Sequence, residues 1–169
     1  MEIFNARRIT NIGVMAALYV VATLLCGGLA YGQVQFRVSE MLMLLCFFNK
    51  DYIISMTLGC FIANLFSSLG FIDAGFGTAA TLLAAILIYV SRNKTNLFVA
   101  SLFPVITNAF IVAAELKMVL GLPYWVNAAW VALGEFVCVS VLGVIVVSAL
   151  AKNKGFMKLI MTGSEVKTA

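Results

Sequence analysis

The chain has 169 residues, of which 63% are hydrophobic and 11% are charged. Soluble domains are about 45–50% apolar and about 25% charged, so an excess this large must face lipid rather than one soluble core. We therefore predict a single all-α, multi-pass domain, residues 1–169, in the cell membrane. The net charge of +4 is explained by membrane topology and requires no nucleic-acid partner. Because histidine is absent and the four cysteines are scattered in apolar stretches, we expect no metal and no cofactor.

Six apolar segments follow one another along the chain. A helix needs roughly 20 apolar residues to cross a lipid bilayer, and the second segment is much shorter than that. It is counted because the charges require another crossing. The first segment also resembles a signal peptide, but its apolar run is longer than the usual signal core of about 7–15 residues. The predicted helices cover about residues 9–30, 37–48, 52–69, 74–91, 97–117 and 125–151.

Positive charges predict the orientation, because they collect on the cytoplasmic side. Six crossings place nine of the 11 Lys and Arg residues on one side and leave Arg37 and Lys117 on the other. Five crossings lose this separation, so both termini are predicted to be cytoplasmic. The nine residues are Arg7, Arg8, Lys50, Arg92, Lys94, Lys152, Lys154, Lys158 and Lys167.

Polar side chains within the apolar segments gather in the predicted outer half, which indicates a site open to the outside. Glu135 is the clearest case, because its charge lies inside a long apolar helix and needs a partner. That partner is either a ligand or Arg37, and Arg37 can also pair with Glu40. The candidate site residues are Tyr31, Gln35, Arg37, Glu40, Asn64, Asp73, Thr78, Asn108, Glu115, Trp130 and Glu135.

Two features of the outer half have alternative interpretations. Aromatic residues near helix ends, such as Tyr124 and Trp125, suit either a binding site or the membrane interface. The connection from Tyr31 to Phe36 contains Gln33 and Gln35 between apolar neighbours. It is either a lid over the site or a plain solvated loop.

Several function classes lack support in the sequence. The motifs GxxxxGK[ST], HExxH and GxSxG are absent, so we expect neither ATP hydrolysis nor catalytic residues. A channel would need polar residues along its full depth. Here the polar residues gather in the predicted outer half, so the sequence does not support a channel. An outward-open site on so short a chain indicates a binding subunit that works with another component.

Three stretches resemble the QueT family of queuosine-precursor transporters: YGQVQFRVSE at 31–40, GCFIAN at 59–64 and GTAATL at 77–82. Pro104, Asn108 and the pair Gly134-Glu135 are also similar, and the resemblance covers about residues 8–150. It implies the substrate-binding S component of an energy-coupling factor (ECF) importer, with six helices. The implied partners are one transmembrane coupling protein and two ATPase subunits, and the implied transport movement is toppling of the S component.

The resemblance also implies a ligand and a docking face. The ligand is a 7-deazaguanine such as the aminomethyl precursor of queuosine, whose N–H groups suit carboxylate acceptors. The docking face is an AxxxA-like motif on the first helix, for which Gly13 and Ala17 are the nearest match. The alternatives are an S component for another vitamin or small cationic nutrient, and a non-transporting membrane scaffold.

Overall fold

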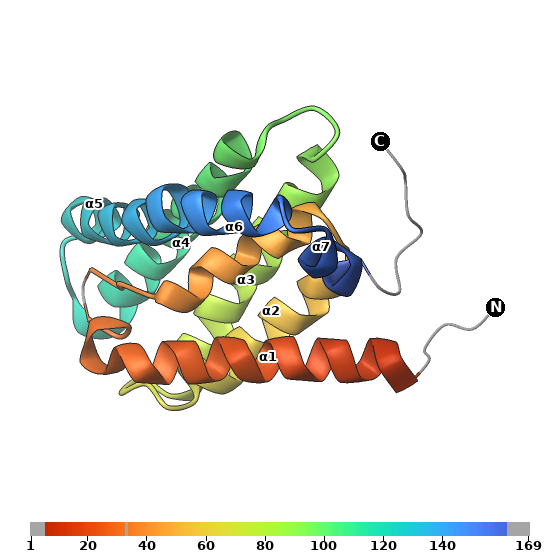
Figure 1. Cartoon of the computed structure of the whole chain (residues 1–169). Coiled ribbons are helices and arrows are strands. Elements are labelled where there is room, and N and C mark those ends of the chain that lie inside the picture. Colours follow the sequence, from red (N-terminus) through yellow and green to blue (C-terminus); the bar gives the residue numbers. More distant parts are fainter. Residues whose placement is uncertain (1–5, 33, 162–169) are drawn as a thin grey trace.

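A computed structural model describes residues 6–32 and 34–161, so Gln33 and Lys167 lie outside the described residues. Within this part of the chain every regular element is helical (Figure 1). The elements are α1 (Ala6–Cys26), η1 (Gly27–Leu29), η2 (Val38–Phe47), α2 (Asp51–Asn64), α3 (Phe71–Ser91), α4 (Leu97–Leu120), α5 (Tyr124–Glu135), η3 (Phe136–Gly143), α6 (Val144–Ala151) and α7 (Lys154–Ile160).

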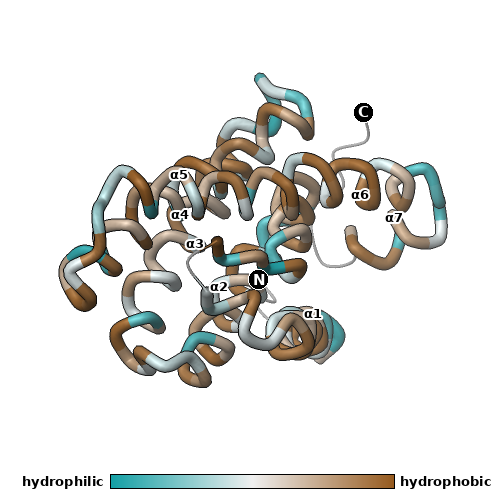
Figure 2. Tube along the Cα trace, turned by 90° about the vertical axis from the view of Figure 1, so that its left-hand side faces the viewer, coloured by the Kyte–Doolittle hydropathy of each residue, from teal (hydrophilic) through white to brown (hydrophobic). Residues whose placement is uncertain are grey.

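The long helices have the length and composition of membrane spans. Within the described ranges four stretches qualify: Ala6–Leu29, Phe71–Ser91, Leu97–Leu120 and Tyr124–Ala151. Large apolar side chains cover their outer surfaces, and Figure 2 shows hydrophobic stretches running along these helices. A helix with an apolar exterior and internally bonded backbone is stable in lipid. The chain is thus an all-α, multi-pass membrane protein.

The predicted count of six crossings depends on two shorter helices. Val38–Phe47 is apolar but short, and α2 has 14 residues. The helix predicted over 52–69 ends at Asn64, five residues earlier than expected, because residues 65–70 form turns before α3 begins. Six crossings and cytoplasmic termini therefore remain predictions.

The short second helix is a 3-10 helix of ten residues. A 3-10 helix rises about 2.0 Å per residue, so ten residues cover about 20 Å, against about 15 Å for an α-helix. Figure 1 shows η2 passing through the centre of the bundle. It packs against η3 and contacts α1, α2, α3, α4 and α6. Its buried Met43 and Leu44 belong to the main apolar core.

The helix predicted over 125–151 is continuous but changes its hydrogen-bond pattern. Its middle third, η3, is a π-helix, in which the backbone bonds span five residues. Glu135 is the last α-helical residue before this change. The wider helical turn alters the angular spacing of side chains beyond Glu135.

The bundle has two distinct ends, which Figure 1 shows on the left and right. We call the end that carries residues 27–32, 34–37, 65–70 and 121–123 the connection end. We call the opposite end the terminal end. It carries the start of α1, the α3–α4 connection and α7.

Candidate functional site

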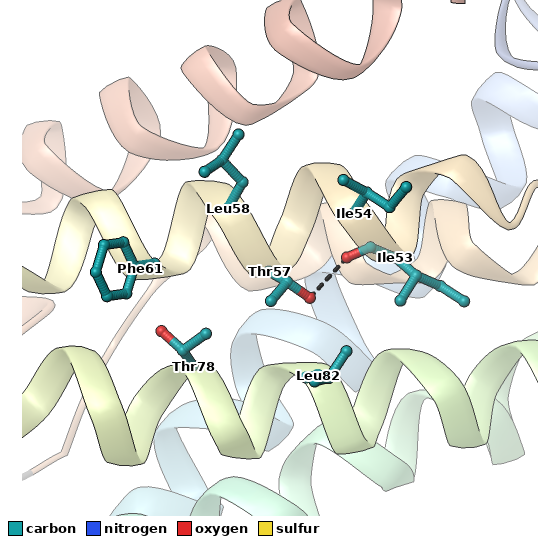
Figure 3. A pocket seen from close by; sticks show the side chains of 7 residues that line it. All are labelled: Ile53, Ile54, Thr57, Leu58, Phe61, Thr78 and Leu82. Carbon is teal, nitrogen blue, oxygen red and sulfur yellow. Dashed lines mark hydrogen bonds between the residues drawn. The ribbon is translucent and has the colours of Figure 1, made fainter. Parts of the chain in front are cut away.

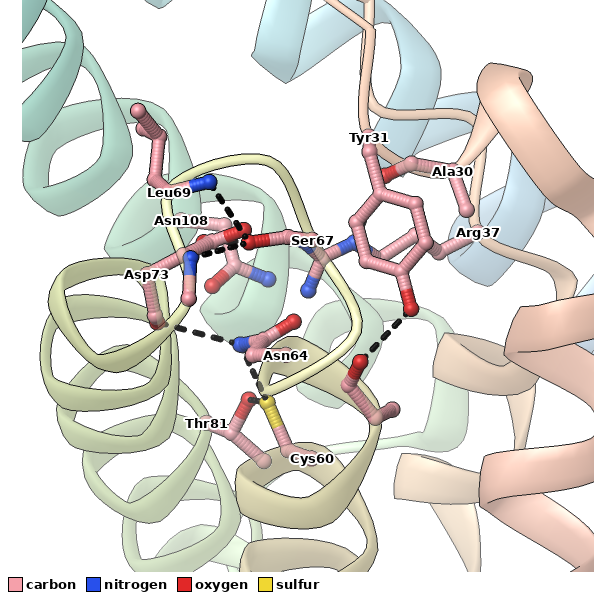
Figure 4. Close-up of polar contacts among 12 residues, drawn as sticks. Ala30, Tyr31, Arg37, Cys60, Asn64, Ser67, Leu69, Asp73, Thr81 and Asn108 are labelled. Atoms are coloured by element: carbon pink, nitrogen blue, oxygen red, sulfur yellow. Dashed lines mark hydrogen bonds and ion pairs between the residues drawn. The ribbon is translucent and has the colours of Figure 1, made fainter.

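Polar side chains from six segments converge near the connection end. They come from the loop before η2, from the start of η2, from the end of α2, from the start of α3, and from α4 and α5. Figure 4 shows four of them directed toward one another: Arg37, Asn64, Asp73 and Asn108. These side chains are almost fully buried, as are Gln35, Glu40, Glu115 and Glu135.

Arg37 is held in place by contacts on three sides. Its Nε donates to the carbonyl oxygen of Ala30 at 2.9 Å, and its guanidinium carbon lies 5.6 Å from the centre of the Tyr31 ring. Its Nη2 lies 3.8 Å from Asp73 Oδ1. The sequence suggested Glu135 or Glu40 as its structural partner. In the described part of the chain, the ion pair of Arg37 is instead with Asp73.

Asn64 links the end of α2 to the start of α3. Its Nδ2 donates to the carbonyl oxygen of Asp73 at 3.2 Å. A side chain at Gly77 would collide with this amide group, so the absence of a Cβ there allows Asn64 to lie against α3. The glycine therefore positions both Asn64 and Asp73.

Glu135 has a hydrogen-bond donor on the neighbouring helix. Asn108 Nδ2 donates to Glu135 Oε1 at 2.9 Å. Glu115 lies seven residues after Asn108, which places both on the same face of α4. Asn108 and Glu115 on α4 therefore extend the polar cluster from Glu135 toward the connection end.

Glu40 is bound by a residue that the sequence reasoning missed. The Tyr19 hydroxyl donates to Glu40 Oε1, and Tyr19 is fully buried. One turn further along α1, Thr23 shares a 2.6 Å hydrogen bond with Ser39. The signal was present in the sequence, because Tyr19 and Thr23 are polar residues four apart on one face of an apolar helix.

The loop before η2 covers one side of the cluster. Gln35 is buried with φ at +49°, and it is the one non-glycine residue with positive φ among those described. Such a conformation costs roughly 1–2 kcal/mol and persists only where its surroundings enforce it. The carbonyl of Val34 lies against Gly134, where a Cβ would collide with it. The loop therefore packs directly beside Glu135.

Tyr31 anchors the start of this loop to α2. Its hydroxyl donates to the carbonyl oxygen of Ala63 at 2.7 Å. Burial raises the pKa of this hydroxyl, which keeps it protonated as a donor at neutral pH. Of the aromatic candidates, Tyr31 is the one that contacts Arg37.

Two of the predicted site residues face elsewhere. Trp130 is 44% exposed on the outer surface of α5. Thr78 lines an apolar groove of about 380 Å³ between α2 and α3, with Thr57, Phe61 and Leu82 among its neighbours (Figure 3). Trp125, weighed as a site or interface residue, is also exposed.

The polar cluster contains many buried atoms without a hydrogen-bond partner. Leaving such an atom unpaired costs about 1–3 kcal/mol, and native structures contain few of them. Here carboxylate and amide oxygens predominate, so the cluster suits a molecule rich in N–H donors. Among the described residues these atoms are Arg37 Nη2, Glu40 Oε2, Asn64 Oδ1, Asp73 Oδ1, Glu115 Oε1 and Oε2, and Glu135 Oε2. Thr78 Oγ1 is also unpartnered, but it lies beside the groove between α2 and α3.

An apolar helical exterior around such a cluster is the arrangement of a multi-pass membrane protein that handles a polar solute. The sequence model of the QueT transporter family matches residues 9–152. The chain belongs to this family, whose members are transporters and not enzymes.

One relative supports the same assignment. The Queuosine precursor transporter QueT of Lactococcus lactis subsp. cremoris (strain MG1363) is 36% identical over 159 residues, which cover 86% of this chain and 92% of the relative. No solved structure matches the chain.

Proposed function

We propose that the chain is the substrate-binding S component of an ECF-type importer, and that its ligand is a queuosine precursor of the 7-deazaguanine class. The observation that carries this proposal is the set of unpartnered buried oxygens around Arg37. A 7-deazaguanine has N–H donors along its guanine edge, and its aminomethyl form adds an ammonium group. Carboxylates accept such donors in strong, charge-assisted hydrogen bonds.

The ligand would complete the site by pairing these atoms. Glu115 and Glu135 supply three unpartnered oxygens on two neighbouring helices, while Arg37 Nη2 supplies a donor. An arginine donor suits the exocyclic oxygen of the guanine ring. Binding would thus replace several unpaired buried groups with hydrogen bonds, which favours a specific ligand over a generic cation.

The ligand itself provides the most direct test. We expect mass spectrometry of the small molecules released from the purified protein to detect a 7-deazaguanine. Release of another vitamin or cationic nutrient would identify an S component of different specificity. A protein that retains nothing and binds no 7-deazaguanine on titration would instead be a scaffold.

The outer face of α1 supports docking to a coupling protein that carries two ATPase subunits. Gly13 and Ala17 are both exposed, and a Cβ at Gly13 would meet no atom within 4 Å in the described structure. Small exposed residues at this spacing let another helix approach closely.

Replacing Gly13 or Ala17 with Leu tests this docking face. We expect uptake to fail while ligand binding by the isolated protein survives. The matched control is Gly75→Leu on α3, because Gly75 is equally exposed and its Cβ would also meet nothing within 4 Å. Normal uptake by both α1 variants would place docking elsewhere.

Six crossings with cytoplasmic termini complete the proposal. Arg8 forms a salt bridge with Asp51, and Asn49 donates a hydrogen bond to the carbonyl oxygen of Ile160. These contacts hold the basic N-terminal and C-terminal segments together at the terminal end. Cysteines introduced at Lys50, Asn93 and Lys154 should be protected from an impermeant external reagent, and one at Lys117 should react. Labelling of the Lys50 site from outside would contradict six crossings.

A further inference from the structure

An apolar groove of about 360 Å³ opens between α1, η2, α6 and α7 at the terminal end. Val14 and Leu18 line it from α1, Leu150 from α6, and Phe156 and Leu159 from α7. We propose that this groove binds one acyl chain of an anionic phospholipid, whose phosphate is held by the basic residues at the rim. This proposal does not depend on the identity of the transported ligand.

An α-helix with its side chains is about 10–12 Å wide. A flexible acyl chain is narrower, and the apolar wall between α1 and α6 gives it a continuous surface to follow.

The charges at the rim complement an anionic headgroup. Lys152 and Lys154 are exposed beside the α6 and α7 walls. On the α1 side, Arg7 lies one helical turn before Asn11, which itself lines the groove. Asp51, the described acid at this end, is bound by Arg8. The rim is therefore positive on both sides, as expected for recognition of anionic lipids.

The wall formed by α7 is fixed at both of its ends. Asn153 Oδ1 accepts hydrogen bonds from the backbone N–H groups of Gly155 and Phe156 at 2.9 and 3.2 Å. Asn49 Nδ2 donates to the carbonyl oxygen of Ile160 at 2.9 Å. Lys154 begins this helix, two residues before the groove residue Phe156. The groove is thus preformed, with its apolar wall and charged rim adjacent.

Headgroup recognition is tested by titrating the delipidated, full-length protein with phosphatidylglycerol or phosphatidylcholine of identical acyl chains. Native mass spectrometry counts the bound lipid. We expect phosphatidylglycerol to bind about tenfold more tightly, and Lys152→Gln with Lys154→Gln to abolish the difference. The control, Arg92→Gln with Lys94→Gln, makes the same charge change on the α3–α4 connection. This variant should retain the tighter binding of phosphatidylglycerol. Equal affinity for the two lipids in the unmodified protein would overturn the proposal.

Acyl-chain binding is tested by filling the groove. Val14→Trp and Leu159→Trp alter side chains that are 59% and 57% exposed, so the core remains intact. Each variant should lower the binding affinity for both lipids at least severalfold. Val21→Trp is the control, because Val21 is 53% exposed on α1 outside the groove lining.

Circular dichroism and thermal unfolding establish that each tryptophan variant is folded. Unchanged lipid affinity in folded groove variants would overturn the proposal. If these variants instead lose association with a partner protein, the groove is a protein-docking surface.

Discussion

The two ends of the bundle differ in whether their buried polar groups have hydrogen-bond partners. At the terminal end, Asp51 accepts from Arg8 Nε and Nη2 at 2.7 and 2.5 Å. The neighbouring Asn49 uses both ends of its amide, accepting from the Asp51 backbone N–H and donating to Ile160. At the connection end, by contrast, Glu115 has two unpartnered oxygens and Glu135 has one among the described residues.

Buried polar residues of the same types can therefore have two roles: some stabilise the fold, and others are kept for function. A fully paired network stabilises the fold and holds one arrangement. Unpaired acceptors cost stability unless something else pairs with them, and a protein keeps such a cost where function requires it. The terminal end therefore fastens α1, α2 and α7 together, whereas the unpaired acceptors of the connection end are consistent with the ligand site proposed above.

The largest effect is expected from Glu135→Gln. The variant keeps the size of the side chain and its bond with Asn108 but removes the charge. We expect ligand affinity to fall by about 2–5 kcal/mol, as for loss of one partner of a buried charged pair. Isothermal titration and thermal unfolding of the same preparation measure affinity and stability separately.

Asp73→Asn is the comparison for that variant, because Asp73 forms the ion pair with Arg37. Its thermal stability should fall. If Glu135→Gln instead lowers stability and leaves affinity near normal, Glu135 serves the fold and the distinction between the two ends fails.

Asp51→Asn should have the converse effect. Loss of the paired charge at the terminal end should lower the free energy of unfolding by about 1–3 kcal/mol, because the ion pair between Arg8 and Asp51 is lost. Ligand affinity should stay within about twofold. A loss of affinity as large as that of Glu135→Gln would show that the two ends are not independent.

Tyr19→Phe should have a smaller effect, and it tests how the site is positioned. Without the hydroxyl, Glu40 Oε1 loses its donor, and we expect ligand affinity to fall about threefold to tenfold. Tyr52→Phe makes the same chemical change at another buried tyrosine outside the site. Equal effects of the two variants on ligand affinity would show that Tyr19 has no specific role in positioning the site.

The smallest effect concerns the loop before η2. If this loop is a lid, Gln33→Ala with Gln35→Ala should speed ligand dissociation by about twofold to tenfold, as measured by stopped-flow release. Gly134→Ala should also speed it, because the new methyl group displaces the Val34 carbonyl. An unchanged dissociation rate in both variants would favour a plain solvated loop.

The sequence by itself determined the membrane class, the helical architecture and the family. The hydropathy of a segment is added over about 20 residues. It therefore locates long helices such as 74–91 without knowledge of the helices that pack against them. The depth of the polar residues also followed from the sequence, since depth depends on position along a helix. Asn64, Asp73, Asn108 and Glu135 accordingly lie close together in the structure.

Only the tertiary structure decided which way each side chain faces and which partner it meets. Thr78 and Trp130 share the predicted depth of the cluster, but Thr78 lines the groove between α2 and α3 and Trp130 is exposed on α5. Tyr19 binds Glu40, and Asp73 pairs with Arg37, through contacts between helices that no local pattern specifies. The physical reason is rotational: turning a helix about its axis leaves the depth of its residues unchanged but alters which of them face the interior, and packing between helices selects that side.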